Sequence, residues 1–358
     1  MSLARVGKGS ERATLDPFEA LVGDIRPRDQ RDLMERPFFA LAKTRRVKPI
    51  LYKAGDTEVQ VYAVPEHGMA TIWDADVLIW AASQIVEAGD RGLATSRFFR
   101  FTPYQLLRAV GRATGQREYL LLKAAMARLQ STVVRTNICH GAHWRRQQFS
   151  WISEWEECLT HSGRCLGMEF VLPEWFYHGV IDRRLVLSIE AAYFALTGGI
   201  ERWLYRVARK HAGRQPEGWR FDLRHLHAKS ASQARFADFS LDIRRLVRRQ
   251  ALPGYTLHLE DGADGAALLK IRPRRAVPVD RLRTQPTGIG TWGASDHGIS
   301  GAGISGHQAH ACRLTHSPRK RNSIPNASNV ESNSIAPEEA AAGGQPAGGA
   351  VPRDEGTP

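Results

Sequence analysis

The side chains of this sequence that are best suited to binding chemistry are arginines that gather in one short stretch. Apolar residues in that stretch recur at the spacing of one helical face: they are Phe236, Phe239, Ile243, Leu246 and Val247. The opposite face carries Arg244, Arg245, Arg248 and Arg249. Guanidinium groups donate paired N–H bonds to phosphate oxygens. Arginines four residues apart on a helix repel each other by roughly a few tenths of a kcal/mol, so the pattern predicts a polyanionic partner.

The elements predicted around this basic helix have the order of a winged-helix DNA-binding domain. A shorter helix precedes it over 223–228, with Asp222 as its N-cap, and a Pro-Gly pair follows it. Two strand-like runs come next, Tyr255–Glu260 and Ala267–Pro273, joined by a turn rich in glycine and aspartate. A helix, a basic-faced helix and a β-hairpin in this order are typical of that domain.

Different roles are predicted for the polar residues of this module. Recognition helices read base edges mainly from their first residues, which the sequence places at Lys229, Ser230, Ser232, Gln233 and Arg235. Phosphate contacts that give affinity without sequence choice are expected further along the helix, from Arg244, Arg245, Arg248 and Arg249. Two interpretations stay open for the basic residues at the end of the hairpin: they contact the flanking DNA backbone, or they belong to a basic linker. These residues are Arg272, Arg274 and Arg275.

A similar order of elements is predicted earlier in the chain. Strand-like segments at 49–53 and 58–64 precede helices at about 75–88, 103–112 and 116–130, and strands at 132–138 and 148–155 follow as a second wing. Asp74 and Thr102 are the predicted N-caps of the first two of these helices, and Pro103 takes the first helical position after Thr102. Arg117 and Arg128 lie on the side of the third helix that faces away from its apolar stripe, which makes them candidates for a second DNA contact.

The sequence therefore predicts an α+β fold with two tandem winged-helix domains. The expected organisation is a flexible arm (1–32), an N-terminal winged-helix domain (33–165), a C-terminal winged-helix DNA-binding domain (166–284) and a disordered tail (285–358). The net charge of the chain is +13. Residues 285–358 hold five Lys/Arg and six Asp/Glu, so the whole basic excess lies in the predicted domains. Nucleic acid is the usual partner of such a charge distribution.

Several classes of protein are disfavoured. Four cysteines in 358 residues argue against a disulfide scaffold and fit a reducing cytoplasm. The first residues lack the pattern of a signal peptide, and no apolar run of about 18 residues predicts a membrane span. The phosphate-loop, nucleophile-elbow and zinc-protease motifs are all missing from the sequence. We therefore expect a cytoplasmic protein that has no membrane contact, no cofactor and no catalytic residues.

Two groups of potential metal ligands are interpreted as structural. Six sulfur or imidazole side chains fall within one window, but their spacing contains no C-x-x-C pair: they are Cys139, His140, His143, Cys158, His161 and Cys165. His225 and His227 match the His-hydrophobe-His triplet of strand-nicking initiators. In the helix predicted here, residues two apart point in opposite directions and share no metal. We therefore expect no metal site.

Long segments of the sequence resemble the replication initiator protein A family of bacterial plasmids and integrated mobile elements. The resemblance spans about residues 33–275 and rests on six blocks in the family's order: RPFFALAKTRR (36–46), FSWISEWEE (149–157), LPEWFYHGVIDRRLVLSI (172–189), YFALTGGIERWLYRVARKHAGRQ (193–215), WRFDLRHLHAKSAS (219–232) and RRQALPGYTL (248–257). The first 30 residues and the glycine-rich tail are not part of it.

The resemblance implies a plasmid replication initiator without enzymatic activity. Such proteins bind repeated double-stranded sites, called iterons, in an origin. They help to open adjacent AT-rich DNA and to recruit the host replication initiator and the replicative helicase. By this resemblance residues 229–249 are the principal reader. Arg117, Arg128 and the 132–155 wing then hold the backbone, or the first domain forms a homodimer. The alternatives are a transcriptional repressor of the same fold and a rolling-circle initiator that nicks one strand.

Overall fold

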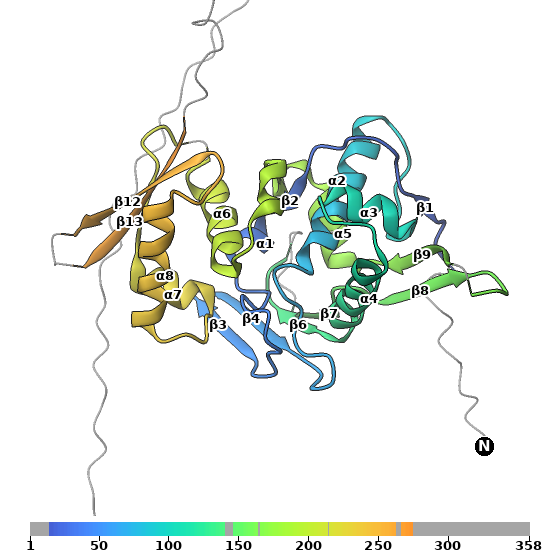
Figure 1. The fold of residues 1–358 in the computed structure, drawn as a ribbon, viewed down its shortest axis with the longest axis horizontal. Helices are drawn as coiled ribbons and strands as arrows, with labels where there is room; N and C mark the ends of the chain where they lie inside the picture. Colours follow the sequence, from blue (N-terminus) through green and yellow to red (C-terminus); the bar gives the residue numbers. More distant parts are fainter. Residues whose placement is uncertain (1–13, 140–145, 164, 214, 263–265, 275–358) are drawn as a thin grey trace, which may run out of the picture. The chain divides into compact units, whose positions relative to one another are not determined.

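The computed structural model describes residues 14–139, 146–163, 165–213, 215–262 and 266–274, and Figure 1 follows their course. The described residues belong to one compact unit, in which helices alternate with several small sheets. The predicted tail 285–358, Arg275 and residues 1–13 of the predicted arm lie outside the described residues.

The first half of the unit alternates short strands and helices. Its elements are β1 (Phe18–Glu19), β2 (Arg28–Gln30), α1 (Arg31–Glu35), β3 (Ile50–Ala54), β4 (Thr57–Tyr62), α2 (Ala75–Asp90), β5 (Phe98–Phe101), α3 (Pro103–Ala109), α4 (Gln116–Ser131), β6 (Val133–Thr136), β7 (Gln147–Ser150), β8 (Glu154–Leu159), β9 (Cys165–Val171) and α5 (Glu174–Ile181).

The second half has fewer strands and carries the basic helix. Its elements are the 3₁₀ turns η2 (Arg183–Leu185) and η3 (Ala191–Ala195), the strand β10 (Val186–Ser188), then α6 (Gly199–His211), β11 (Trp219–Asp222), α7 (Leu223–Ser230), α8 (Phe236–Arg249), β12 (Tyr255–Asp261) and β13 (Ala267–Pro273). The predicted basic helix is confirmed, although it begins at Phe236 and not near Lys229. The predicted hairpin after it is confirmed with bounds that agree to within one residue.

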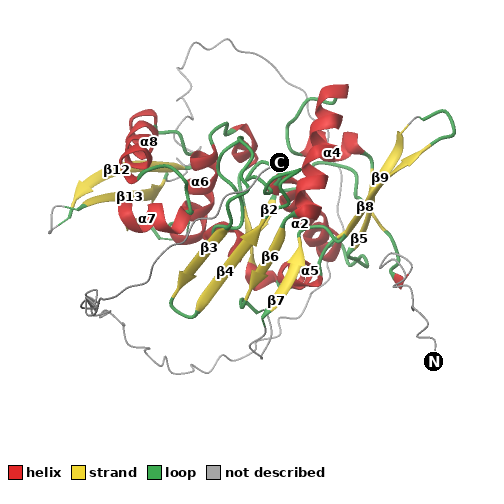
Figure 2. Cartoon of the chain, turned by 90° about the horizontal axis from the view of Figure 1, so that it is seen from below, coloured by secondary structure: helices red, strands yellow, loops and turns green. Residues whose placement is uncertain are grey.

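Hydrogen bonds join the strands into four sheets. Their strand orders are β3-β4-β6-β7, β1-β5-β9-β8, β10-β2 and β11-β13-β12. Figure 2 shows the strands of the first of these sheets side by side. In the last sheet, the edge strand β11 comes before α7 and α8 in sequence, yet it pairs with β13, which follows them. β11 and β12 therefore flank β13 in one sheet, and the segment that joins β11 to β12 contains the basic helix α8.

Two of the three predicted helix N-caps are confirmed. The Thr102 hydroxyl accepts the backbone N–H of Gln105, and Pro103 occupies the first turn of α3, where its missing N–H costs nothing. The Asp222 carboxylate accepts the backbone N–H of His225 at the start of α7. Asp74 precedes α2 but makes no capping bond, because its carboxylate binds other groups.

Residues 14–32 do not form the irregular arm that their polarity suggested. β2 pairs with β10 over three residues, and β1 pairs with β5. Asp29 is 1% exposed, and its carboxylate accepts two bonds from the Arg206 guanidinium, at 2.7 and 3.0 Å. A polar segment is buried here because its charges and backbone groups find partners in the second half, which no local pattern reveals.

The predicted wing of the first half also differs from the structure. β6 is an inner strand between β4 and β7, and the predicted strand 148–155 is broken in two. Trp151 and Ile152 are fully buried at the break, so the chain crosses the core there before β8 joins another sheet. The predicted boundary at 165/166 falls within β9, which pairs with β5 and β8 of the first half. The division into two domains stays a prediction.

The apolar face predicted for the basic helix is the face that packs inward. Phe239, Ile243 and Leu246 on α8 are at most 3% exposed. Phe239 meets the ring of Trp203 on α6 with the ring centroids 6.4 Å apart. Burying a large apolar side chain stabilises a fold by about 1.5–3 kcal/mol, so these three residues fix which side of α8 faces outward.

Candidate nucleic-acid interface

The outer face of α8 is basic, as the sequence predicts. Its last two turns expose the side chains of Arg244, Arg245, Arg248 and Arg249. α8 begins at Phe236, and its first residues follow a turn that leaves α7 through Ala231, whose φ is +47°. This left-handed residue ends α7 and reverses the chain, so that the following turn lies beside the start of α8.

Only part of the predicted base-reading group lies at the start of the basic helix. Gln233 and Arg235 are exposed there, and 87% of the Arg235 side chain is accessible. Ser232 is half-buried, and its hydroxyl accepts the backbone N–H of Ala234 at 3.2 Å. Of the residues in this turn that were predicted to contact bases, Gln233 and Arg235 are therefore the most exposed.

The predicted position of Lys229 and Ser230 is wrong. Both belong to the last turn of α7 and are at most 7% exposed. The Lys229 ammonium donates to the Glu35 carboxylate at 2.9 Å, and burial, with Arg36 nearby, lowers the pKa of Lys229 to about 8. The Ser230 hydroxyl donates to the His227 carbonyl at 2.7 Å. α7 runs about half a turn further than its sequence suggests, because its end is set by Ala231.

The four arginines of α8 differ in their partners. Arg245 donates to Asp242 at 3.0 Å, and Arg249 donates to Glu201 at 2.6 Å. The Arg245–Asp242 pair is exposed, and such pairs contribute only about 0–1 kcal/mol. The Glu201 carboxylate that accepts from Arg249 is only 10% exposed. In the part of the chain that the structure describes, Arg244 and Arg248 have no acidic partner. Their guanidinium groups are therefore available to bind an external anion.

Acidic residues on α8 moderate the basic face more than its arginine run suggests. Asp238 accepts from Arg235 at 3.0 Å, and Asp242 accepts from Arg245 at the same distance. Both acids lie three residues from their arginines, which are neighbouring positions on a helix surface. No acid stands among residues 244–249, but the helix as a whole carries Asp238 and Asp242.

The predicted wing arginines lie at the base of the hairpin. Tyr255 pairs with Pro273, so Arg272 and Arg274 flank the end that is farthest from the turn. Arg272 donates to the Glu217 carboxylate at 2.9 Å, and Arg274 donates to the Tyr255 carbonyl at 3.0 Å. Both guanidiniums therefore have structural partners in the absence of DNA.

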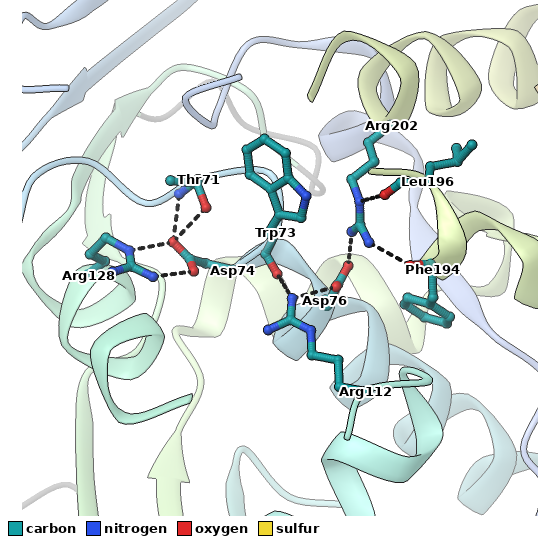
Figure 3. Close-up of polar contacts among 9 residues, drawn as sticks. All are labelled: Thr71, Trp73, Asp74, Asp76, Arg112, Arg128, Phe194, Leu196 and Arg202. Atoms are coloured by element: carbon teal, nitrogen blue, oxygen red, sulfur yellow. Dashed lines mark hydrogen bonds and ion pairs between the residues drawn. The ribbon is translucent and has the colours of Figure 1, made fainter. Parts of the chain in front are cut away.

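In the first half, Arg117 and Arg128 have very different surroundings. Arg117 is exposed near the start of α4 and has no acidic partner among the described residues. Arg128 forms a two-bond pair with Asp74, at 2.7 and 2.8 Å, which Figure 3 shows. This hydrogen bonding raises the pKa of Arg128 and outweighs its burial. Asp74 also accepts the Thr71 N–H and hydroxyl, which explains why it does not cap α2.

A second buried acid beside this pair was missed by sequence reasoning. Asp76 accepts from Arg112 at 2.9 Å and from Arg202 of α6 at 2.7 Å (Figure 3). Burial raises the pKa of Asp76, and the two guanidiniums oppose that shift. The only signal in the sequence was the alternation of Asp74 and Asp76 around a helix start, which gives no hint of partners this far away along the chain.

The described histidines and cysteines contribute to one close group of possible metal ligands, which consists of Glu156, Cys158 and Glu169. His225 and His227 lie in α7, as expected, and the His227 imidazole is 2.8 Å from the Ala234 carbonyl. Of the cysteine window, His140 and His143 lie outside the described residues. Cys158 lies within 4.8 Å of two glutamates, one of which, Glu169, accepts from Arg100 at 2.6 Å. The expected lack of a metal stays a prediction.

Comparisons with known proteins agree with these observations on two levels. Residues 28–257 match the family model described as replication initiator protein A. A relative from Wigglesworthia glossinidia brevipalpis, named "Putative replication protein", is 30% identical over 237 residues, which cover 63% of this chain and 82% of that protein.

At the level of the fold, the chain is similar to a crystal structure of domains 2 and 3 of RctB. The TM-score is 0.50 and the identity 14%, with 68% of this chain and 98% of that one covered. None of the helices among the described residues has the length and apolar composition needed to cross a bilayer.

Proposed function

The chain belongs to the replication initiator protein A family, and on that basis we propose that it binds repeated double-stranded DNA sites in a replication origin. The second half would be a winged-helix domain with α8 as its recognition helix. Its order of elements, α6-β11-α7-α8-β12-β13, with β11 paired to β13, is the order expected of such a domain. The observation that carries the proposal is the outward basic face of α8.

The residues of this face divide into two proposed roles. Gln233 and Arg235, at the start of α8, would contact base edges in the major groove. Arg244 and Arg248 would bind phosphates, because they are exposed cations that need not leave an acidic partner first. Arg245 would join them by exchanging Asp242 for phosphate, and Arg249, whose side chain is 63% exposed, would do so while it keeps its bond to Glu201.

Origin opening and recruitment are further parts of the proposal. We propose that the protein acts through binding free energy and not as an enzyme. Several copies on adjacent sites would bend the origin, and the cost would fall on flexible AT-rich steps. Host initiator and helicase contacts, and a homodimer formed through the first half, are the partners that the family resemblance implies.

The proposal is tested by footprinting the purified protein on the DNA that flanks its gene. Regularly spaced protected repeats are expected for an iteron initiator, whereas one palindrome over a promoter would indicate a repressor. Cleavage of single-stranded origin DNA in Mg²⁺ or Mn²⁺ would contradict the non-enzymatic mechanism.

Salt dependence separates the two proposed roles on α8. Replacing Arg248 by alanine is expected to weaken every duplex and to make the log–log salt slope shallower by about 0.9, since one phosphate contact is lost. Arg235→Ala should instead reduce discrimination between sites by about 1–3 kcal/mol. Arg91→Ala is the control, because Arg91 is an exposed, paired arginine at the end of α2. Equal slopes for Arg248→Ala and Arg91→Ala would remove α8 from the interface.

A further inference from the structure

A cavity of about 510 Å³ lies in the first half, beside the polar network of Figure 3. Its walls come from the segments 43–45 and 67–74, from Arg112, from both ends of α4, and from Arg202 of α6. Small-molecule sites in proteins typically have volumes of about 300–1,000 Å³. The cavity is therefore large enough for a ligand such as a nucleotide.

The walls of this cavity carry an excess of positive charge. Six basic side chains line it, namely Lys43, Arg45, Arg112, Arg117, Arg128 and Arg202. Asp74 binds Arg128, and the single charge of Asp76, just below, is shared by two guanidiniums. Glu118 is the remaining acid on the wall. The cations thus outnumber the nearby acids, and an anion entering the cavity would be attracted.

Two cations at the rim are free to meet that anion. Lys43 and Arg117 are exposed, and in the described ranges neither of them has an acidic partner. The start of α4 also lies on this wall, since Arg117 and Glu118 line the cavity, and the helix has no side-chain cap at Gly115. Helix N-termini of this kind favour negative charge.

An aromatic ring stands among these cations. Trp73 is partly exposed on the wall, and the Lys43 ammonium lies 5.2 Å from the centre of its ring. The position of the residue is fixed, since its carbonyl accepts from Arg112 at 2.9 Å. Its indole packs close to Gly199, where an added Cβ would lie 3.1 Å from the ring. The Lys43 ammonium lies over the Trp73 ring, so the indole offers a stacking surface once that ammonium turns to a phosphate, and both groups lie within one cavity.

We propose that this cavity binds a nucleotide unit, with the base stacked on Trp73 and the phosphate held by Lys43 and Arg117. Stacking on aromatic rings combined with basic side chains is how proteins hold unpaired nucleotides without choosing a sequence. The occupant is a free nucleotide or one nucleotide of an unpaired DNA strand, which share this chemistry. The site goes beyond the duplex contact proposed for α8 and uses residues that α8 does not supply.

The test measures fluorescence anisotropy of the full-length protein with a labelled oligothymidylate of about 12 nucleotides. Trp73→Leu is expected to weaken binding by roughly 5- to 150-fold, the range found for removing one stacking contact. Lys43→Ala should weaken oligonucleotide binding several-fold. Its affinity should also fall less steeply with salt than that of the wild type, because one phosphate contact is lost. Trp219→Leu and Lys48→Ala are matched controls, because both residues are exposed and neither lines the cavity.

Competition distinguishes the two sources of the nucleotide. Displacement of the oligonucleotide by thymidine monophosphate would assign the site to free nucleotides, and failure of displacement would assign it to a strand. If Trp73→Leu lowers the melting temperature strongly, Trp73→Phe and Lys43→Ala decide, since phenylalanine keeps a smaller stacking ring. Wild-type oligonucleotide affinity in both of these folded variants would overturn the proposal.

A duplex measurement keeps this inference separate from the proposed function. The folded Trp73 and Lys43 variants should bind a footprinted duplex site as the wild type does, whereas Arg248→Ala should lose duplex affinity alone. Equal losses for duplex and oligonucleotide in the Lys43 variant would make the cavity part of the duplex surface and refute the nucleotide site. If no duplex site exists but Trp73-dependent binding persists, only the proposed function fails.

Discussion

Replacing Asp29 by asparagine should destabilise the protein far more than its place near the N-terminus suggests. Asp29 and Arg206 are each 1% exposed in their side chains, and they are joined by bonds of 2.7 and 3.0 Å. The substitution keeps the shape of the side chain but leaves the guanidinium buried without a counter-charge. Removing one member of such a pair costs about 3–5 kcal/mol.

The magnitude is large enough to measure by thermal or urea unfolding followed by circular dichroism. For a domain of this size, each kcal/mol shifts the melting temperature by about 2–4 °C, so a decrease of roughly 6–20 °C is expected. Asp182→Asn is the matched control. Asp182 also pairs with an arginine through two bonds, but its partner Arg184 is 87% exposed, so the loss should stay within about 1 kcal/mol.

A double variant tests whether an unpaired buried charge causes the loss of stability. Asp29→Leu with Arg206→Met removes both charges together, and it should recover much of the stability lost in Asp29→Asn, because no uncompensated charge stays buried. A loss below about 1 kcal/mol for Asp29→Asn would show that the pair does not hold β2 against α6. A double variant that is less stable than Asp29→Asn would show that packing, and not charge, dominates there.

Three further outcomes are expected. Burial, with help from Lys229 and Lys210, lowers the pKa of His211 from 6.5 to about 4, although Glu35 lies 3.5 Å away. The fold therefore favours neutral His211, and its contribution is lost as the pH falls from about 6.5 towards 4. After discounting for solvent screening, unfolding free energy measured at pH 7 and pH 5 should fall by about 1 kcal/mol more in the wild type than in His211→Gln. Gly199→Ala should cost about 1–3 kcal/mol in urea unfolding, because its Cβ would overlap the Leu41 carbonyl oxygen; unchanged stability would mean that α6 shifts freely. Deleting 285–358 should leave melting and duplex affinity nearly unchanged, since that segment holds no apolar periodicity, and a large loss of either would show that it packs against the rest.

Local patterns predicted the two helices α7 and α8 and the hairpin that follows them. The stripe of Phe239, Ile243 and Leu246 repeats at the helical period, so it fixes both the helix and its inward face. Thr102-Pro103 and Asp222 carry their caps in adjacent residues. The family resemblance, which the family match over 28–257 confirms, also came from consecutive residues.

The candidate sites were predicted less well, because their members are brought together by the fold. Lys229 was expected to face DNA, yet it is occupied by Glu35, a residue 194 positions earlier. Arg128 was expected to be available for DNA, yet its guanidinium donates to the Asp74 carboxylate. A cation looks the same in sequence whether its counter-charge is DNA or a distant carboxylate, and only tertiary contacts distinguish the two.

The sequence by itself determined the family of this protein, the apolar and basic faces of α8, and the hairpin that follows it. These depend on periodicity and on neighbouring residues, which the order of residues states directly. Tertiary structure alone decided that Asp29 and Gln30 are buried, with Asp29 paired to Arg206 of α6, and which arginines stay free. It also placed Trp73 beside Lys43 in a basic cavity. The physical reason is that ion pairs and cavities depend on distances in space, and residues far apart along the chain set those distances.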